Sequence, residues 1–93
     1  EGVGVLFDCG EGTQRQLRLA RYSSAKIRYI LISHWHGDHV LGLPGLLQSM
    51  AANNYSGTLM IYGPKGSKRF VKKMFDWFLT ENVVDYKVME VEE

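Results

Sequence analysis

Hydrophobic and polar positions along this chain follow two periodicities, and the changes between them mark the predicted elements. Apolar runs of strand length occupy Val3 to Asp8, Lys26 to Ser33 and Thr58 to Tyr62, with glycine or serine close by. The run from Lys26 is rich in Ile, Tyr and Leu, which predicts a largely buried strand. Tyr86 to Glu92 alternates apolar residues with Lys and Glu, which predicts a fourth strand with one face in solvent.

Between these runs the apolar positions recur at helical spacing. A helix is predicted from Thr13 to about Tyr22, because Thr13 and Gln16 have the spacing of a capping box. A second helix starts near Pro44, which a first turn accepts, and a third runs from Lys65 to Leu79 with one apolar and one basic half. The apolar stripe of the second helix consists of Leu43, Leu46, Leu47, Met50 and Ala51.

Strands that alternate with helices predict an α/β or layered α+β fold, with helices packed on at least part of a sheet. The 93 residues suffice for one small domain or for a piece of a larger one. The chain opens with Glu1 and lacks the basic start and apolar stretch of a signal peptide. We therefore expect its front to be truncated.

Composition narrows the class of partner only slightly. Eleven Lys and Arg against ten Asp and Glu create no global field that would attract nucleic acid or a membrane surface. No apolar run approaches the roughly 20 residues that span a bilayer, so no membrane is expected. Cys9 is the only cysteine, which excludes a disulfide framework within the chain and favours a reducing cytoplasm.

The candidate chemistry is concentrated in Ile32 to His39, the stretch ISHWHGDH. It holds all three histidines and one aspartate, and it follows the predicted second strand directly, where α/β sheets place their ligands. A single histidine is usually a surface or hydrogen-bonded residue, whereas three with an aspartate predict a metal site. For the indole of Trp35 we expect packing and not substrate stacking.

The spacing of these donors predicts two metal ions. His34 and His36 are two residues apart, so in an extended segment both imidazoles project to one side and share one ion. Asp38 and His39 would serve a second ion about 3.5 to 4 Å away, and Gly37 permits the tight loop. The nitrogen and oxygen donors favour two Zn²⁺ ions, with Mn²⁺, Fe or Co as alternatives.

The same segment carries a family resemblance. His34 to His39 matches the HxHxDH signature of the metallo-β-lactamase superfamily, whose fold is an αββα sandwich. LFDCGEGTQRQL (Leu6 to Leu17) and GLPGLL (Gly42 to Leu47) resemble ribonuclease Z, the endonuclease that removes the 3′ trailer of precursor tRNA. YGPKG (Tyr62 to Gly66) resembles the next strand and helix start of that family. The resemblance implies that residues 1–93 form the N-terminal part of a metallo-β-lactamase-like domain, truncated at both ends.

The resemblance also implies a function and residue roles. The chain would be part of a zinc-dependent endoribonuclease that acts on precursor tRNA in the cytoplasm by two-metal phosphodiester hydrolysis, as a homodimer in its full-length form. His34 and His36 would bind one ion. Asp38 and His39 would bind the other, and Asp38 would also accept a proton in catalysis. Asp8 would hold a ligand loop by hydrogen bonds, although its residue type also suits a simple turn cap.

No histidine follows His39, so the remaining ligands implied by the family would come from outside this chain. We therefore expect the 93 residues alone to be inactive. Two alternatives stay open. One is another metallo-β-lactamase-fold hydrolase, such as a phosphodiesterase, arylsulfatase or thioester hydrolase, and the other is a non-catalytic fragment that keeps the motif.

Basic residues on two predicted helices raise the question of RNA contact. Phosphate binding needs local positive charge, which the helix from Lys65 to Leu79 carries along one side. No aromatic residue is interleaved there for base stacking, so an ordinary solvated face is the favoured interpretation. The same two interpretations apply to Arg15, Arg18 and Arg21.

Overall fold

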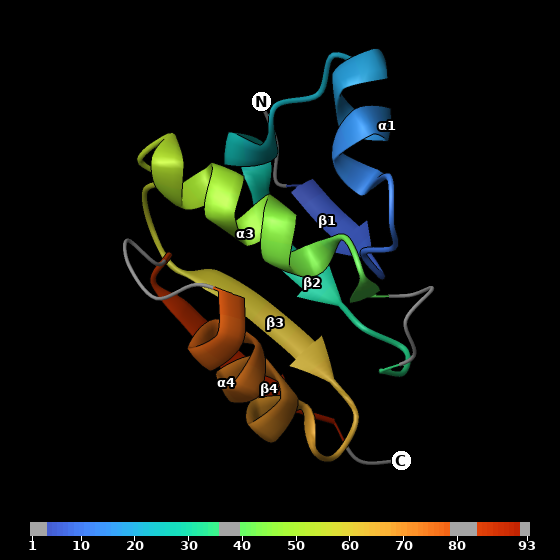
Figure 1. Cartoon of the computed structure of the whole chain (residues 1–93), viewed down its shortest axis with the longest axis vertical. Helices are drawn as coiled ribbons and strands as arrows, with labels where there is room; N and C mark the ends of the chain where they lie inside the picture. Colours follow the sequence, from blue (N-terminus) through green and yellow to red (C-terminus); the bar gives the residue numbers. More distant parts are fainter. Residues whose placement is uncertain (1–3, 36–39, 79–83, 92–93) are drawn as a thin grey trace.

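The computed structural model describes residues 4–35, 40–78 and 84–91, with Phe78 described in its backbone alone. Strands and helices alternate along the chain as the hydrophobic pattern predicts (Figure 1). Over these ranges no helix is long and apolar enough to cross a membrane. The elements are β1 (Gly4–Phe7), α1 (Thr13–Leu19), the 3₁₀ helix η1 (Ser24–Lys26), β2 (Ile27–Leu31), α3 (Leu43–Ala52), β3 (Leu59–Gly63), α4 (Ser67–Phe78) and β4 (Tyr86–Glu90).

The four strands form one parallel sheet in the order β1-β2-β3-β4, which confirms the α/β prediction. Each connection leads from one strand to the next strand in the sheet, always in the same direction. Because connections between parallel strands are right-handed, the helices all pack on one face of the sheet. Figure 1 shows α3 and α4 in front of the sheet. The carboxyl ends of all strands meet at one edge, and the histidine segment leaves β2 at that edge.

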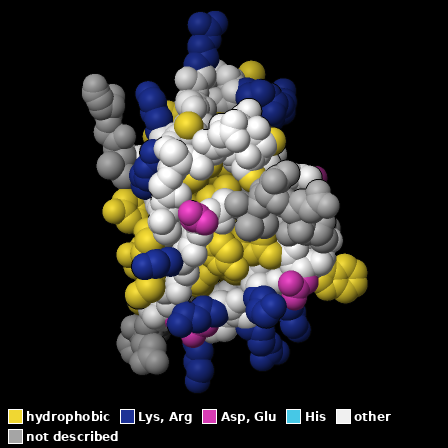
Figure 2. All heavy atoms as spheres, turned by 90° about the vertical axis from the view of Figure 1, so that its left-hand side faces the viewer, with side chains coloured by type: hydrophobic (Ala, Val, Ile, Leu, Met, Phe, Trp, Pro, Cys, Tyr) yellow, Lys and Arg dark blue, Asp and Glu magenta, His cyan; other side chains and the backbone are white. Residues whose placement is uncertain are grey.

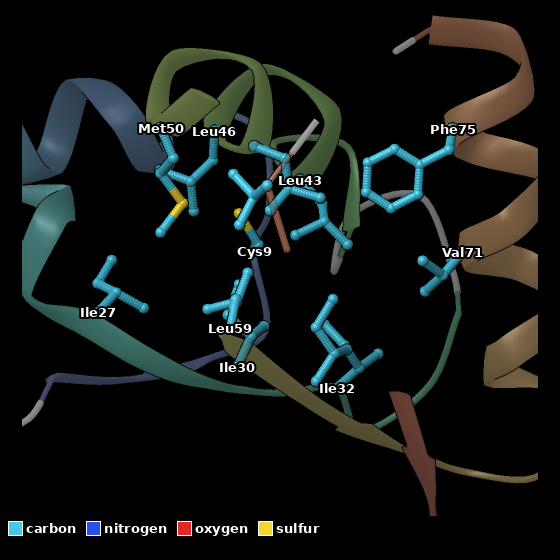
Figure 3. Close-up of a cluster of buried hydrophobic side chains, with 13 residues drawn as sticks. Cys9, Ile27, Ile30, Ile32, Leu43, Leu46, Met50, Leu59, Val71 and Phe75 are labelled. Atoms are coloured by element: carbon cyan, nitrogen blue, oxygen red, sulfur yellow. The ribbon is translucent and has the colours of Figure 1, made fainter. Parts of the chain in front are cut away.

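The hydrophobic core lies between the sheet and these helices. Strand register places Leu6, Ile30, Ile61 and Val88 in one row across the sheet, and the two isoleucines are fully buried. Figure 3 shows side chains from α3 and α4 converging on those of the strands. The predicted stripe of α3 is confirmed, since its buried residues are Leu43, Leu46, Leu47 and Met50.

Cys9 lies in this core immediately after β1 and is fully buried. Burial raises the pKa of its thiol to about 11, although a side-chain hydrogen bond with Thr13 acts in the opposite direction. Because the thiolate is the reactive form, the buried thiol is inert at neutral pH and fills space. It packs between the sheet and α3 (Figure 3).

The opposite face of the sheet is largely uncovered within the described residues. Phe7 of β1 is 74% exposed. On β2, Ile27 and Ile30 are buried but Tyr29 is 38% exposed, so β2 is buried on one face only and the prediction of a largely buried strand was wrong. The side chains of a parallel strand alternate between the two faces, and here only one face meets helices. In Figure 2 hydrophobic side chains reach the surface along the left edge of the view. The other exposed apolar residues of this face are Val5, Met89 and Val91.

The start of α1 differs from the predicted capping box. Its N-cap is Gly12, whose φ of 88° lies in the left-handed region that glycine adopts without strain. The hydroxyl of Thr13 donates to the carbonyl of Gly10 at 2.7 Å instead of accepting a helix amide. The helix ends at Leu19, a few residues before Tyr22. The glycine turn, and not a threonine cap, therefore sets the start of α1.

The apolar half of α4 is only partly buried. Val71 and Phe75 pack into the core, as the helical wheel predicts. Phe70 and Trp77 fall on the same half of the wheel but are 48% and 79% exposed. They border an apolar pocket with Trp35 and the first residues of α3, so this side of α4 faces the histidine segment.

Candidate metal centre

The histidine segment begins where β1 and β2 end side by side. Phe7 pairs with Leu31 at the last position of both strands, and the amide of Asp8 donates to the carbonyl of Leu31 at 2.7 Å. This pairing places the carboxylate of Asp8 next to Ser33, although the two residues are 25 positions apart in the chain. The strand register thus delivers an acidic side chain to the first turn of the segment.

Asp8 holds Ser33 with both of its carboxylate oxygens. Oδ1 accepts the backbone N–H of Ser33 at 2.8 Å, and Oδ2 accepts its hydroxyl at 2.9 Å. Bonds to an ionised carboxylate are shorter and stronger than neutral ones. Asp8 has a φ of 54°, a left-handed conformation that aspartate tolerates better than most residues. A residue that only capped the strand would not need to bind the segment twice.

The hydroxyl of Ser33 also lies 3.0 Å from Nδ1 of His34. A hydroxyl has a single hydrogen, and here it is donated to the carboxylate of Asp8. The contact with His34 is therefore a bond in which Nδ1–H donates to the serine oxygen. A neutral imidazole protonated at Nδ1 carries its lone pair on Nε2, the atom that would bind a metal. In a neutral His34, the contacts around Asp8 thus favour the form with its hydrogen on Nδ1.

Replacing Ser33 by alanine tests this chain of bonds. In the complete protein we expect zinc affinity to fall by about 10-fold or more, because partners that orient a metal-binding histidine usually contribute about 10- to 100-fold. Titration of the metal-free protein against a chromophoric chelator measures the change. Ser33→Thr keeps the hydroxyl at an exposed position and should retain the wild-type affinity. Equal affinities for the alanine and threonine variants would contradict the role of the hydroxyl.

Trp35 is the last described residue before a gap in the segment. As expected, its indole has a packing role: the ring stacks on that of Phe70 in α4. The predicted ligands His36, Asp38 and His39 lie outside the described residues. Within residues 4–35, 40–78 and 84–91, no three side chains of His, Cys, Asp or Glu are grouped so that they could hold a metal. Of the predicted site residues, the structure thus brings together Asp8 and His34.

Ser33 was not among the residues that the sequence singled out. Serine is common before a loop, and only the register of β1 against β2 shows that this one links an aspartate to a histidine. Its position directly before the first histidine was the available signal. Glu11 lies in the turn before α1, and Thr13 is the first residue of that helix.

The basic face of α4 is exposed. Exposure is compatible with both interpretations of this face, contact with RNA and simple solvation. Lys72 pairs with Asp76 at 3.6 Å, an exposed pair whose contribution to stability is small. The carboxylate of Glu90 accepts the backbone N–H groups of Gly66 and Lys68 at the start of the helix. These contacts hold α4 in place and leave its lysines at the surface. The exposed basic residues are Lys65, Lys68, Arg69, Lys72 and Lys73.

Known proteins resemble this chain along almost all of its length. Residues 1–70 match the family described as the metallo-beta-lactamase superfamily. The chain is 47% identical over 92 residues to the ribonuclease Z of Nanoarchaeum equitans, a match that covers 99% of this chain and 29% of that protein. The ribonuclease Z of Ignicoccus hospitalis is 50% identical over 91 residues, with 98% and 30% covered. The chain therefore spans about 30% of the length of these curated relatives.

Solved structures agree with the sequence matches. The human tRNase Z, short form, superimposes with a TM-score of 0.84 at 44% identity, over 97% of this chain and 34% of that one. The metallo-beta-lactamase fold protein YhfI from Bacillus subtilis has a TM-score of 0.72 at 21% identity, with the same coverage, and supports the fold alone. The family match over residues 1–70 and these likenesses establish that this chain belongs to the metallo-β-lactamase superfamily and is a homologue of ribonuclease Z.

Proposed function

We propose that this chain is part of a zinc-dependent endoribonuclease that removes the 3′ trailer from precursor tRNA by two-metal phosphodiester hydrolysis. The observation that carries the proposal is the chain of bonds from Asp8 through Ser33 to Nδ1 of His34. With Nδ1 engaged in this way, Nε2 of His34 would act as a ligand at the edge where the strands end. Homology to ribonuclease Z supports the choice of substrate.

The donor set fits Zn²⁺, with Mn²⁺ or another divalent ion as the alternative. His34 and His36 would hold one ion, and Asp38 and His39 the other. Imidazole and carboxylate groups are common zinc ligands, and a histidine whose second nitrogen is hydrogen-bonded is the usual form. Asp8 would act through Ser33 to support the site. The ligands that complete it would come from outside this chain, so the 93 residues alone should be inactive.

The chain's own residues would have separable tasks in the reaction. Bound divalent ions would supply a nucleophile at neutral pH and offset negative charge on the phosphoryl oxygens. Asp38 would accept a proton from that nucleophile, while His34 would keep its ring oriented through Ser33. The protein would act on precursor tRNA in the cytoplasm, as a homodimer in its complete form.

A comparison of substrates tests the proposal. The complete protein, loaded with zinc, is offered a precursor tRNA, a small phosphodiester and a sulfate ester under the same conditions. We expect specific cleavage of the tRNA at the start of its trailer, and hydrolysis of the small phosphodiester only as a side activity. Preferred hydrolysis of the sulfate ester, with intact tRNA, would instead identify another hydrolase of the superfamily. No hydrolysis of any substrate would favour a non-catalytic role.

A further inference from the structure

Trp35 is attached to α4 by two contacts. Its Nε1–H donates to the hydroxyl oxygen of Ser67 at 2.8 Å. Its indole stacks on the ring of Phe70, with ring centroids 5.5 Å apart and planes inclined by 22°. Trp35 immediately follows His34 and immediately precedes His36, so α4 holds the residue between two predicted ligands.

Ser67, which accepts the indole bond, is itself held firmly. It is fully buried, and its hydroxyl donates to the carbonyl of Pro64 at 2.6 Å. Because the only hydroxyl hydrogen is used in that bond, the serine oxygen is left to accept from Trp35. A Cβ at Gly63 would collide with the Ser67 hydroxyl, so the last residue of β3 must be glycine for Ser67 to occupy this place.

The start of α4 is fixed from a second direction. Glu90, at the end of β4, accepts the backbone N–H groups of Gly66 and Lys68 at 3.1 and 3.0 Å. A carboxylate at the first turn of a helix satisfies amide groups that have no partner within the helix. Ser67 therefore presents its oxygen from a rigid position between β3 and β4.

His34 thus lies between two anchored neighbours. Ser33 on one side is bound by Asp8 at the end of β1, and Trp35 on the other is bound by Ser67 beyond the end of β3. We propose that Trp35 and Ser67 are positioning residues that fix the backbone beside His34, so that α4 raises metal affinity without supplying a ligand. The inference rests on the proposed function, because it assumes that this segment binds metal.

The physical reason is preorganisation. A segment that is ordered before the metal binds loses less conformational freedom when it does. Packing alone would not need the indole N–H, since a phenylalanine at position 35 could still stack on Phe70. The bond to Ser67 is thus the feature that distinguishes a positioning role from space filling.

Two substitutions in the complete protein test the inference. Trp35→Phe removes the donor and keeps a ring to stack, and Ser67→Ala removes the acceptor. Each should weaken zinc binding by about 10-fold, within the range of about 10- to 100-fold that supporting partners contribute. The double variant should bind zinc as tightly as the single variant with the lower affinity, because both changes remove the same hydrogen bond. Titration of metal-free protein with Zn²⁺ against a chromophoric chelator gives these affinities, and unfolding in EDTA reports stability separately.

Ser56→Ala is the matched control for the serine substitution, because Ser56 is exposed and lies in the loop before β3, outside the contacts of Trp35 described here. It should retain the wild-type affinity. If Trp35→Phe and Ser67→Ala unfold earlier in EDTA but bind zinc within twofold of wild type, the contact is packing only and the inference is wrong. A wild-type protein that binds no zinc would overturn the proposed function and this inference together. A Ser67→Ala variant that fails to fold leaves Trp35→Phe to decide the question.

Discussion

Replacing His36 by alanine in the complete protein is expected to abolish cleavage of precursor tRNA while tRNA binding persists. The substitution removes one of the two histidines that would share an ion, so the loss should exceed the roughly 100-fold that the largest effects of supporting partners reach. Binding should persist because contacts to tRNA phosphates do not depend on this imidazole. Single-turnover cleavage and an electrophoretic mobility assay measure the two properties on the same protein.

Gln48→Ala provides a control for this experiment. Gln48 lies on α3, nine residues beyond His39, and its side chain is exposed. The Gln48→Ala variant should cleave precursor tRNA at the wild-type rate. Undiminished cleavage by His36→Ala would show that the segment is not the metal site, even though the protein belongs to the superfamily. Loss of both cleavage and binding would point instead to a folding defect, which a thermal unfolding curve would reveal.

Gly42→Ala is expected to destabilise the protein, because the added methyl group has no room. Gly42 is the N-cap of α3 and lies against the turn after β1, where its amide donates to the carbonyl of Cys9 at 2.9 Å. A Cβ there would collide with the carbonyl oxygen of Gly10 and lie 3.2 Å from that of Cys9. Backbone atoms cannot rotate away, so we expect a loss of about 1 to 3 kcal/mol in the free energy of unfolding.

Gly45→Ala, in the first turns of the same helix, gives the contrasting result. The added methyl group would meet only the side-chain amide of Gln14, with Oε1 2.8 Å away; this amide donates to Ser49 but is the end of a flexible side chain. Alanine is favoured over glycine within a helix by about 0.5 to 1 kcal/mol, so this variant should be neutral or more stable. Denaturant unfolding of both variants measures the difference. Similar stabilities would mean that the turn after β1 yields to α3, contrary to the close contact seen here.

The Gly42 substitution also connects stability to the site. The turn that it would displace begins next to Asp8, which holds Ser33. Zinc affinity should therefore fall in Gly42→Ala and stay unchanged in Gly45→Ala. Such a result would show that the glycine of GLPGLL serves close packing beside the site, a task for which no side chain is needed.

Local pattern was sufficient to predict most of the fold. The alternating positions of β4 and the apolar stripe of α3 depend on residues within a few positions of one another. The donors of the histidine segment are likewise neighbours in the chain, so their spacing alone indicated a metal site. The prediction of a capping box at Thr13 was wrong, because the turn before α1 contains two glycines. Gly12, in the left-handed conformation, is the N-cap instead.

The supports of the segment could not be predicted in this way. Asp8 and Ser33 are 25 residues apart, and Trp35 and Ser67 are 32 apart. Each pair meets because neighbouring parallel strands end at the same edge of the sheet, where α4 also begins. Hydrogen bonds between distant residues depend on strand register and helix placement, which hydrophobic periodicity does not specify. The chain therefore encodes the candidate ligands locally, whereas the contacts that orient His34 and hold Trp35 exist only in the folded sheet.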